Sequence, residues 1–350
     1  PQEKRILEFT GTIEGQDLTE LTFRALVGSL DEKEELVSFD SVASSVLLKR
    51  SFFNLSFLIS GKDVNYVSSG GKVSVSVPWK NKTNNEIRDA IISVKLKGVA
   101  VDEKTITSDN GFYRGFDTSI VWNSSSFSKL NLIAPGEEGL VNFSFSLKDV
   151  IPVFSQSDKN FSLVLDGEMT GSKTGNGGQG AQVRSTVSRE LKISTDAQLT
   201  SRIVYTSGSL PPQVGKKTVY TIFWTVENLY NDISNSVIRA TMPSYVSWVG
   251  EIDPMGENVS YNPSTGEIAW RVDNIKAGSG AVLPGEEVSF QVSFVPALNQ
   301  LGSSPEILSR ASFEGKDTFT GTILRDLSGI LTIKSISEIN NNSLLGSVIE

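Results

Sequence analysis

The stretch that decides the fold runs Val73-Ser74-Val75-Ser76-Val77-Pro78-Trp79. Apolar side chains occupy every second position of this stretch, and serine or proline fills the positions between them. Successive side chains of a β-strand point to opposite faces of a sheet, so one face of this strand enters a core and the other meets water. Half-buried strands of this kind build antiparallel sandwiches.

The same alternation recurs along the chain and is separated by turn residues. Gly70-Gly71 and Pro211-Pro212 are two of these separators. Residues 36–48 fit either helical or strand spacing, and their serine and β-branched residues favour a strand. No convincing capped amphipathic helix is found. Further alternating runs occupy residues 143–147, 161–165, 220–226 and 288–294.

The second half of the chain repeats the first half in the same order and at a nearly constant offset. Internal repetition of this kind indicates stacked copies of one structural unit. We therefore predict an all-β fold made of tandem immunoglobulin-like β-sandwich domains. The matched segments are Val73–Trp79 with Val219–Val226, Ile87–Ile92 with Ile233–Ile238, Ile120–Trp122 with Ile268–Trp270, and Pro135–Glu138 with Pro284–Glu287.

The repeat divides the 350 residues into four parts. We expect one sandwich over residues 51–193 and a second over residues 194–335. Residues 1–50 resemble the closing strands of an earlier repeat, and residues 336–350 are expected to form a linker or tail. Closing strands alone expose unpaired backbone edges, so a longer parent chain or another chain would complete them.

Composition excludes several functional classes. The chain has no cysteine and no histidine, which excludes disulfides, thiolate metal sites and catalytic triads built on histidine. The net charge of -8 argues against nucleic-acid binding. No apolar run approaches the ~18 residues of a membrane-spanning helix, so we expect any anchor or export signal to lie outside this sequence. The lack of cysteine fits export by a bacterium without a disulfide pathway.

Two sets of recurring residues are candidate structural sites. Tryptophan residues recur on the alternating strands, where we expect them to fill the sandwich core. The indole N–H groups of the equivalent residues Trp122 and Trp270 are expected to find hydrogen-bond partners. Proline and glycine precede a strand in each half, where we expect them to form a turn that needs positive φ at glycine. The core set is Trp79, Trp122, Trp224 and Trp270, and the turn set is Pro135, Gly136, Pro284 and Gly285.

No catalytic, cofactor-binding or metal-binding residues are predicted. The adjacent glutamates at 137–138 and 286–287 are interpreted as solvated strand edges, because calcium needs several converging oxygen ligands. No spacing singles out the lysine, asparagine and acid of an intramolecular isopeptide bond. We expect a protein that is not an enzyme and needs no cofactor.

The order of these motifs resembles a known family. A Gly-Lys opening leads into a strand that ends at Asn81 or Asn228, followed by a tryptophan strand and then Pro-Gly-Glu. This order resembles the bacterial cell-surface Ig-like conserved-repeat domains, a broad family of unknown function, and multi-repeat hypothetical surface proteins. The resemblance covers residues 51–335, with 1–50 as a partial copy. It implies export, repeats in series and often an anchor at one terminus.

Three functions remain open from the sequence. The leading hypothesis is an extracellular or cell-surface bacterial structural protein, such as a stalk, filament or envelope-layer unit. The second is an adhesin or ligand-binding module, with recognition on loops such as residues 102–118 or 171–180. The third is an accessory region of a larger extracellular enzyme. We expect protein partners, with copies of the chain joined through β-edges as one candidate.

Overall fold

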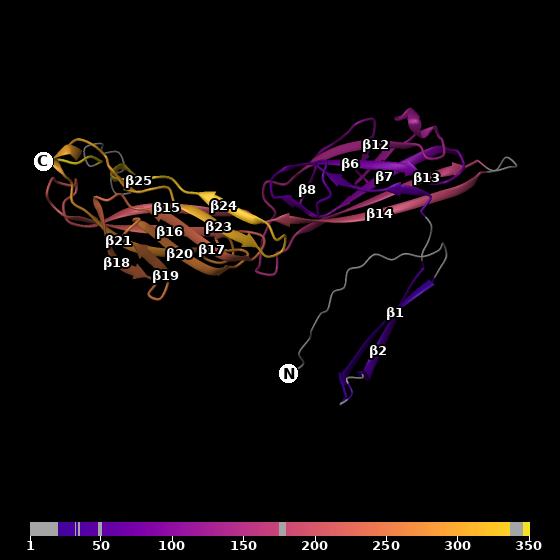
Figure 1. The fold of residues 1–350 in the computed structure, drawn as a ribbon. Helices are drawn as coiled ribbons and strands as arrows, with labels where there is room; N and C mark the ends of the chain where they lie inside the picture. Colours follow the sequence, from indigo (N-terminus) through magenta and orange to yellow (C-terminus); the bar gives the residue numbers. More distant parts are fainter. Residues whose placement is uncertain (1–19, 32, 34–35, 48–50, 175–179, 337–345) are drawn as a thin grey trace.

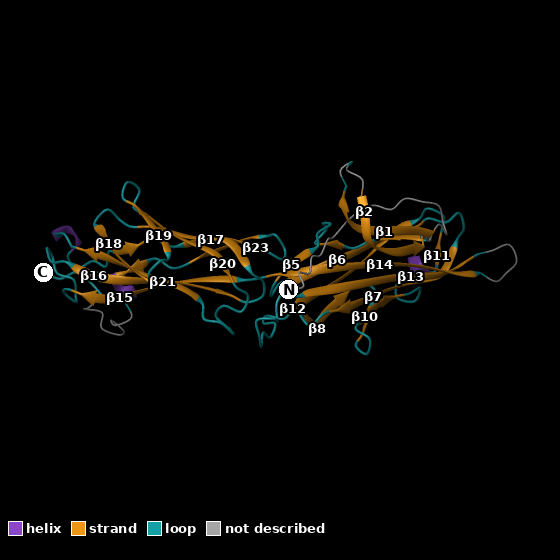
Figure 2. Cartoon of the chain, turned by 90° about the horizontal axis from the view of Figure 1, so that it is seen from below, coloured by secondary structure: helices purple, strands orange, loops and turns teal. Residues whose placement is uncertain are grey.

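The protein is all-β, as predicted. The computed structural model describes residues 20–31, 33, 36–47, 51–174, 180–336 and 346–350. Within these residues the structure contains strands, three short 3-10 helices and no α-helix. Figure 1 shows two elongated sandwiches arranged end to end, and Figure 2 shows the strands running along their length.

The first sandwich packs a five-stranded sheet against a seven-stranded sheet. The five-stranded sheet has the order β3-β6-β12-β8, with β4 also on β6, and the seven-stranded sheet has the order β5-β14-β13-β7-β10-β9, with β11 also on β7. The strand bounds of the first sheet are β3 (Phe53–Leu55), β4 (Leu58–Ile59), β6 (Lys72–Asn81), β8 (Val101–Ser108) and β12 (Glu138–Leu147). Those of the second are β5 (Tyr66–Ser68), β7 (Ile87–Lys97), β9 (Phe112–Arg114), β10 (Ser119–Trp122), β11 (Leu132–Ile133), β13 (Ser162–Lys173) and β14 (Ala181–Ser194), with the 3-10 helix η1 (Ser128–Leu130) before β11.

The second sandwich has the sheet orders β15-β16-β21-β18 and β19-β20-β17-β23-β24, and β22 pairs with β25 beside them. Its first sheet contains β15 (Ala197–Ser207), β16 (Thr218–Asn228), β18 (Val246–Asp253) and β21 (Glu286–Phe294). Its second sheet contains β17 (Ile233–Thr241), β19 (Asn258–Asn262), β20 (Glu267–Ile275), β23 (Ser312–Asp317) and β24 (Ile323–Leu327). The remaining elements are β22 (Glu306–Leu308), β25 (Leu331–Thr332), η2 (Leu298–Gln300) and η3 (Ile333–Ser335).

Each sandwich has its own hydrophobic core, built by the alternating strands. The deciding stretch forms β6, in which Val73, Val75, Val77 and Trp79 are buried. Its hydrogen-bonded partner β12 contributes the buried residues Phe143 and Phe145. Because burial of apolar surface is the main force that stabilises a domain, these two neighbouring strands supply one side of the first core.

A tryptophan faces a glycine across two strands of the first sandwich, and neither residue type recurs at the matching pair of the second. Trp79 lies opposite Gly139 in the pairing of β6 with β12. In the second sandwich Val226 occupies the matching place, two residues before the strand-ending asparagine, and lies opposite Glu286. A Cβ atom on Gly139 would lie 2.3 Å from the Trp79 ring, so the large indole requires glycine across the sheet.

The predicted tail differs from the structure at both of its described ends. Ile336 and Val348 are buried and belong to the core of the second sandwich. The backbone N–H of Val348 donates to Ser303 O at 2.9 Å, and that of Ile349 donates to Pro212 O at 2.9 Å. The sequence did not predict this packing because the segment is rich in serine and asparagine and has few apolar residues. Its partners Ser303 and Pro212 are distant in the sequence and come next to Val348 and Ile349 only in the fold.

The N-terminal strands form a hairpin. Strand β1 (Glu20–Leu30) pairs antiparallel with β2 (Leu36–Leu47), so residues 36–47 form a strand, as predicted. Within the described residues these two strands pair only with each other. One face carries Phe23 and Val42, which are 50% and 68% exposed, while Thr22 on the opposite face shares a hydrogen bond with Ser45. The hairpin therefore presents an apolar face to its surroundings.

Candidate functional sites

A buried asparagine closes one end of each sandwich. Asn81 Nδ2 lies 2.9 Å from Asn85 O, 3.3 Å from Ile133 O and 3.0 Å from Ala134 O. The corresponding bonds of Asn228 Nδ2 reach Asn231 O at 2.6 Å, Ile275 O at 3.5 Å and Lys276 O at 3.1 Å. Both side chains are fully buried, and they tie the end of one sheet to the turn that leaves the other.

We call Asn81 and Asn228 the asparagine anchors. Their hydrogen bonds show that the Pro-Gly turn predicted in both halves forms only in the first sandwich. Gly136 follows Pro135 at φ +74°, as the turn prediction required, and its N–H donates to Asn81 O at 3.0 Å. Gly285, after Pro284, does not have positive φ. In the second sandwich the glycine two residues after the anchored carbonyl of Lys276 is Gly278, at φ +83°. The sequence match paired the two Pro-Gly segments because their residues are identical. The hydrogen bonds of the buried asparagines show instead that the turn at Gly278 is the structural equivalent of the turn at Gly136.

The acceptor side of the two anchors differs. Asn81 Oδ1 accepts from its own loop, from the N–H and the hydroxyl of Thr83 at 2.9 and 2.8 Å. Asn228 Oδ1 accepts from Thr195 Oγ1 at 2.6 Å. Thr195 lies between the end of β14 and the start of β15, so the second anchor holds the linker between the sandwiches.

Asp317 collects hydrogen bonds from both sandwiches. This fully buried carboxylate accepts from the Thr195 backbone N–H at 2.9 Å and from Asn231 Nδ2 at 2.8 Å. It also accepts from Ser194 Oγ at 3.3 Å, and from the N–H groups of Phe319 and Thr320 at 2.8 and 3.0 Å. Burial alone raises the pKa of Asp317, but these hydrogen bonds outweigh it and hold the pKa below its ordinary value.

Tyr230 inserts from the second sandwich into the core of the first. It is buried among the residues of the first core, and its hydroxyl accepts from Ile151 N–H at 3.1 Å. Its carbonyl accepts from Asn160 N–H at 3.0 Å, and its ring meets Phe161 edge-on with centroids 5.8 Å apart. The two sandwiches therefore share part of one core at their junction.

Polar contacts surround this junction. Lys159 Nζ lies 2.8 Å from the Asp232 carboxylate, and Lys192 Nζ donates to Phe319 O at 3.1 Å while lying 4.6 Å from its ring centroid. Partly exposed contacts of this kind add little stability. The buried contacts of Tyr230 and Asp317 therefore dominate the junction.

The predicted core tryptophans are all buried, with two different polar environments. Trp122 Nε1 donates to Asp109 O at 2.8 Å, and Trp270 Nε1 donates to Glu257 Oε2 at 2.8 Å. The indole N–H groups of Trp79 and Trp224 have no hydrogen-bond partner in the described structure. Alternation indicated the burial of these rings, but it carried no information about their polar partners.

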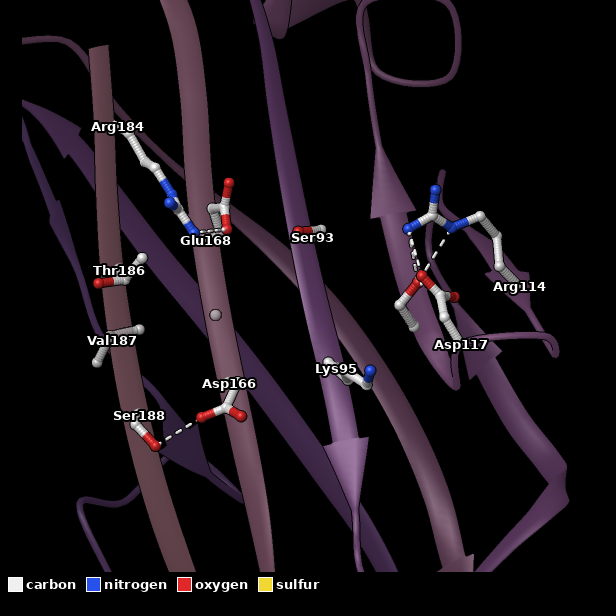
Figure 3. A pocket seen from close by; sticks show the side chains of 12 residues that line it. Ser93, Lys95, Arg114, Asp117, Asp166, Glu168, Arg184, Thr186, Val187 and Ser188 are labelled. Carbon is white, nitrogen blue, oxygen red and sulfur yellow. Dashed lines mark hydrogen bonds and ion pairs between the residues drawn. The ribbon is translucent and has the colours of Figure 1, made fainter.

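A polar groove lies on the outer face of the seven-stranded sheet. It has a volume of about 430 Å³ and crosses β14, β13, β7, β10 and the β9–β10 turn. Figure 3 shows Arg184 and Glu168 on one side, the Arg114–Asp117 pair on the other, and Ser93 and Lys95 between them. The guanidinium nitrogen and carboxylate oxygen are 2.7 Å apart in the Arg184–Glu168 pair and 2.9 Å apart in the Arg114–Asp117 pair. Sequence reasoning missed this groove because strand register, rather than proximity in sequence, assembles it.

The described residues contain neither a cluster of metal ligands nor a helix that could span a membrane. No group of three or more His, Cys, Asp or Glu side chains is placed to hold a metal ion in this part of the chain. Over the same residues no helix is long and apolar enough to cross a membrane.

No family model matches the chain, and no curated protein matches it. Among solved structures, the chain is similar to the C-terminal domain of the Streptococcus agalactiae AgI/II polypeptide BspA, with 10% identity and a TM-score of 0.29, covering 80% of this chain and 99% of that one. It is also similar to the C-terminal domain of the Streptococcus pyogenes antigen I/II-family protein AspA, with 12% identity and a TM-score of 0.28, covering 81% and 99%. Similarity at this level does not identify a shared function.

Proposed function

We propose that this protein is a non-enzymatic structural protein of a bacterial cell surface, in which rigidly joined sandwiches act as a spacer in a stalk, filament or envelope layer. The observation that supports this proposal is the buried junction between the sandwiches. The absence of cysteine and histidine and the multi-sandwich architecture fit the same role.

The junction differs from an ordinary connection between domains. Domains joined by an exposed linker are expected to move relative to each other. Here only Thr195 and Asp196 separate β14 from β15. Thr195 is fixed to the second sandwich by two hydrogen bonds, from its backbone N–H to Asp317 and from its hydroxyl to Asn228. Tyr230 also fills part of the neighbouring core. These contacts hold the two sandwiches at one relative angle.

Distances between spin labels test this rigidity. The chain has no cysteine, so Ser125→Cys and Ser264→Cys place one label on an exposed turn of each sandwich without background labelling. We expect one narrow distance distribution. A broad distribution, or one that widens to the limits of a free linker, would contradict the spacer function.

Partners are proposed to be proteins, including copies of the same chain joined through strand edges. The hairpin β1–β2 supports this, because an isolated two-stranded sheet is only marginally stable and its outer edges carry unpaired backbone groups. Electron microscopy of the purified chain would show ordered polymers if copies join in this way, and isolated particles if they do not.

A ligand-binding module is the second candidate function, and the groove of the first sandwich favours it. Binding residues are often placed by a rigid sheet. The β9–β10 turn, within the loop region considered for recognition, forms one wall of the groove through Asp117. An adhesin role and a spacer role are compatible in one chain, because they use different surfaces.

A further inference from the structure

One row of side chains crosses the groove on five neighbouring strands. The strand register places these residues directly opposite one another on the outer face of the sheet. Neighbouring strands lie about 4.8 Å apart, so the row spans about 19 Å, which is wide enough for two sugar rings. The row reads Ser188, Asp166, Lys95, Ser119 and Arg114, from β14 to β9.

The carboxylates of the groove are already bound to protein groups. Asp166 accepts from Lys97 at 2.6 Å and from Ser188 at 2.7 Å, and the lysine and the serine hydroxyl hold its pKa below the ordinary value. Glu168 accepts from Arg184 at 2.7 Å. Because the oxygens of Asp166 and Glu168 are already bound to protein cations and a hydroxyl, they are poorly placed to bind a cationic ligand.

Lys95 is the exception among the charged residues of the groove. It makes no hydrogen bond and no ion pair within 4 Å to any described residue, although it lies opposite Asp166 in the register. The lining holds three cations, Lys95, Arg114 and Arg184, and three carboxylates, Asp117, Asp166 and Glu168. Each carboxylate is already paired with a cation other than Lys95, namely Arg114, Lys97 and Arg184 in turn. The unpaired ammonium group of Lys95 therefore favours an anionic group on the ligand.

Hydroxyl groups and one aromatic ring complete the surface. Ser93 and Thr186 line the groove, and their hydroxyls have no partner among the described residues. In the β9–β10 turn, between the lining residues Arg114 and Asp117, Phe116 is 85% exposed, and the Arg114 guanidinium lies 5.3 Å from its ring centroid. The ring in the β9–β10 turn offers an apolar contact for the C–H face of one sugar unit, and the hydroxyls on β7 and β14 offer hydrogen bonds to the units that extend across the sheet.

The sheet backbone argues against a peptide as the ligand. Peptides that bind sheets usually add a strand to a free edge, where backbone groups are unpaired. In this groove β13, β7 and β10 are paired on both sides, so their backbone groups are engaged within the sheet. Only side chains are available for contacts, and those of the groove without a partner among the described residues are the Lys95 amine and the hydroxyls of Ser93 and Thr186.

We propose that this groove binds an acidic saccharide, with the sugar carboxylate on Lys95, sugar hydroxyls on Ser93 and Thr186, and one ring face against Phe116. The volume lies within the range of small-molecule sites. The inference rests on the second candidate function, ligand binding, and is independent of the spacer function.

Calorimetric titration of the full chain tests this assignment. The probes are a hyaluronan tetrasaccharide, 3′-sialyllactose, the neutral sugar lactose and a glutamate-rich peptide. We expect at least one acidic sugar to bind at least about tenfold more tightly than lactose and the peptide. Loss of binding to both acidic sugars at millimolar concentration, equal binding of lactose, or tighter binding of the peptide would overturn the proposal.

Single substitutions locate the site. Lys95→Gln is expected to weaken the acidic sugar about tenfold, and Phe116→Ala to weaken it severalfold. Both side chains are at the surface, so thermal unfolding should stay unchanged and confirm the fold. Lys104→Gln, an exposed lysine on β8 of the other sheet, is the matched control and should bind like the parent. Wild-type binding by Lys95→Gln would overturn the assignment, and spin-label distances would still report on the spacer function separately.

Discussion

The hydroxyl of Tyr230 accepts a hydrogen bond from the backbone N–H of Ile151 at 3.1 Å, across the boundary between the two sandwiches. Tyr230 follows Asn228 by two residues, so the loop that the asparagine anchor holds also delivers the tyrosine to the neighbouring core. Anchor, linker and inserted ring are therefore one structural unit, and the predictions below test its parts.

Removing the Tyr230 ring should destabilise the first sandwich although the residue belongs to the second. Tyr230→Ala is expected to cost about 3–5 kcal/mol, since it opens a cavity in a closed core. Tyr230→Phe keeps the ring and leaves the Ile151 N–H unpaired, at a cost of about 1–3 kcal/mol. Denaturant unfolding measures both. Tyr205→Phe, whose exposed hydroxyl bonds to Gly208 O at 2.8 Å, is the control and should change little.

The two anchoring asparagines give a matched pair for the junction. Asn81→Ala and Asn228→Ala should each cost about 2–3 kcal/mol, because buried carbonyls lose their donors. Only Asn228→Ala should widen the spin-label distance distribution, because only Asn228 binds Thr195. Equal widening in both variants would mean that the linker contact does not hold the sandwiches.

Asp317 should make the junction sensitive to acid. Its folded-state pKa lies below the ordinary value, so the stability it contributes is present above the unfolded pKa of about 4 and is lost as pH falls through the folded pKa. Asp317→Asn should lower stability at neutral pH by about 3 kcal/mol and flatten the stability profile below pH 4. Urea midpoints between pH 2 and 7 measure this. An unchanged acid slope in the variant would assign the acid sensitivity to other carboxylates.

The opposed pair Trp79 and Gly139 should respond as a unit. Gly139→Ala alone forces a Cβ against the indole and should cost about 1–3 kcal/mol. Trp79→Val alone leaves a cavity, and the double variant should cost less than the sum of the two single changes, as in the second sandwich with its smaller Val226. Gly71→Ala is the control, since its added Cβ would lie 3.6 Å from the nearest atom. A purely additive double variant would contradict this coupling.

The hairpin β1–β2 should drive association of the chain. Phe23→Lys and Val42→Lys place charge on its apolar face and are expected to shift light-scattering mass toward the monomer. Thr22→Lys changes the opposite face and is the control. If all three variants and the parent remain monomeric at every concentration, copies do not join through this hairpin.

The sequence predicted the strands well because alternation reports directly which face of a strand is buried. Trp79 and the valines before it show this in β6. The prediction that Pro284-Gly285 forms the same turn as Pro135-Gly136 was wrong, because the equivalent turn is the one whose carbonyl accepts a hydrogen bond from the buried Asn228. Asp317 could not be assigned from the sequence, because its donors Thr195 and Asn231 reach it only through pairing of distant strands. The groove escaped prediction for the same reason, since its row of five side chains exists only in the register.

The shortness of the linker limits how the joint responds to pulling. Two fully extended residues span about 7 Å, so the linker of Thr195 and Asp196 can lengthen very little. A pulling force along the chain would therefore act almost immediately on the hydrogen bonds of Thr195 and on the buried side chain of Tyr230. A surface fibre built from such joints would transmit tugging forces rather than absorb them, and any stretching would have to come from the unravelling of whole sandwiches.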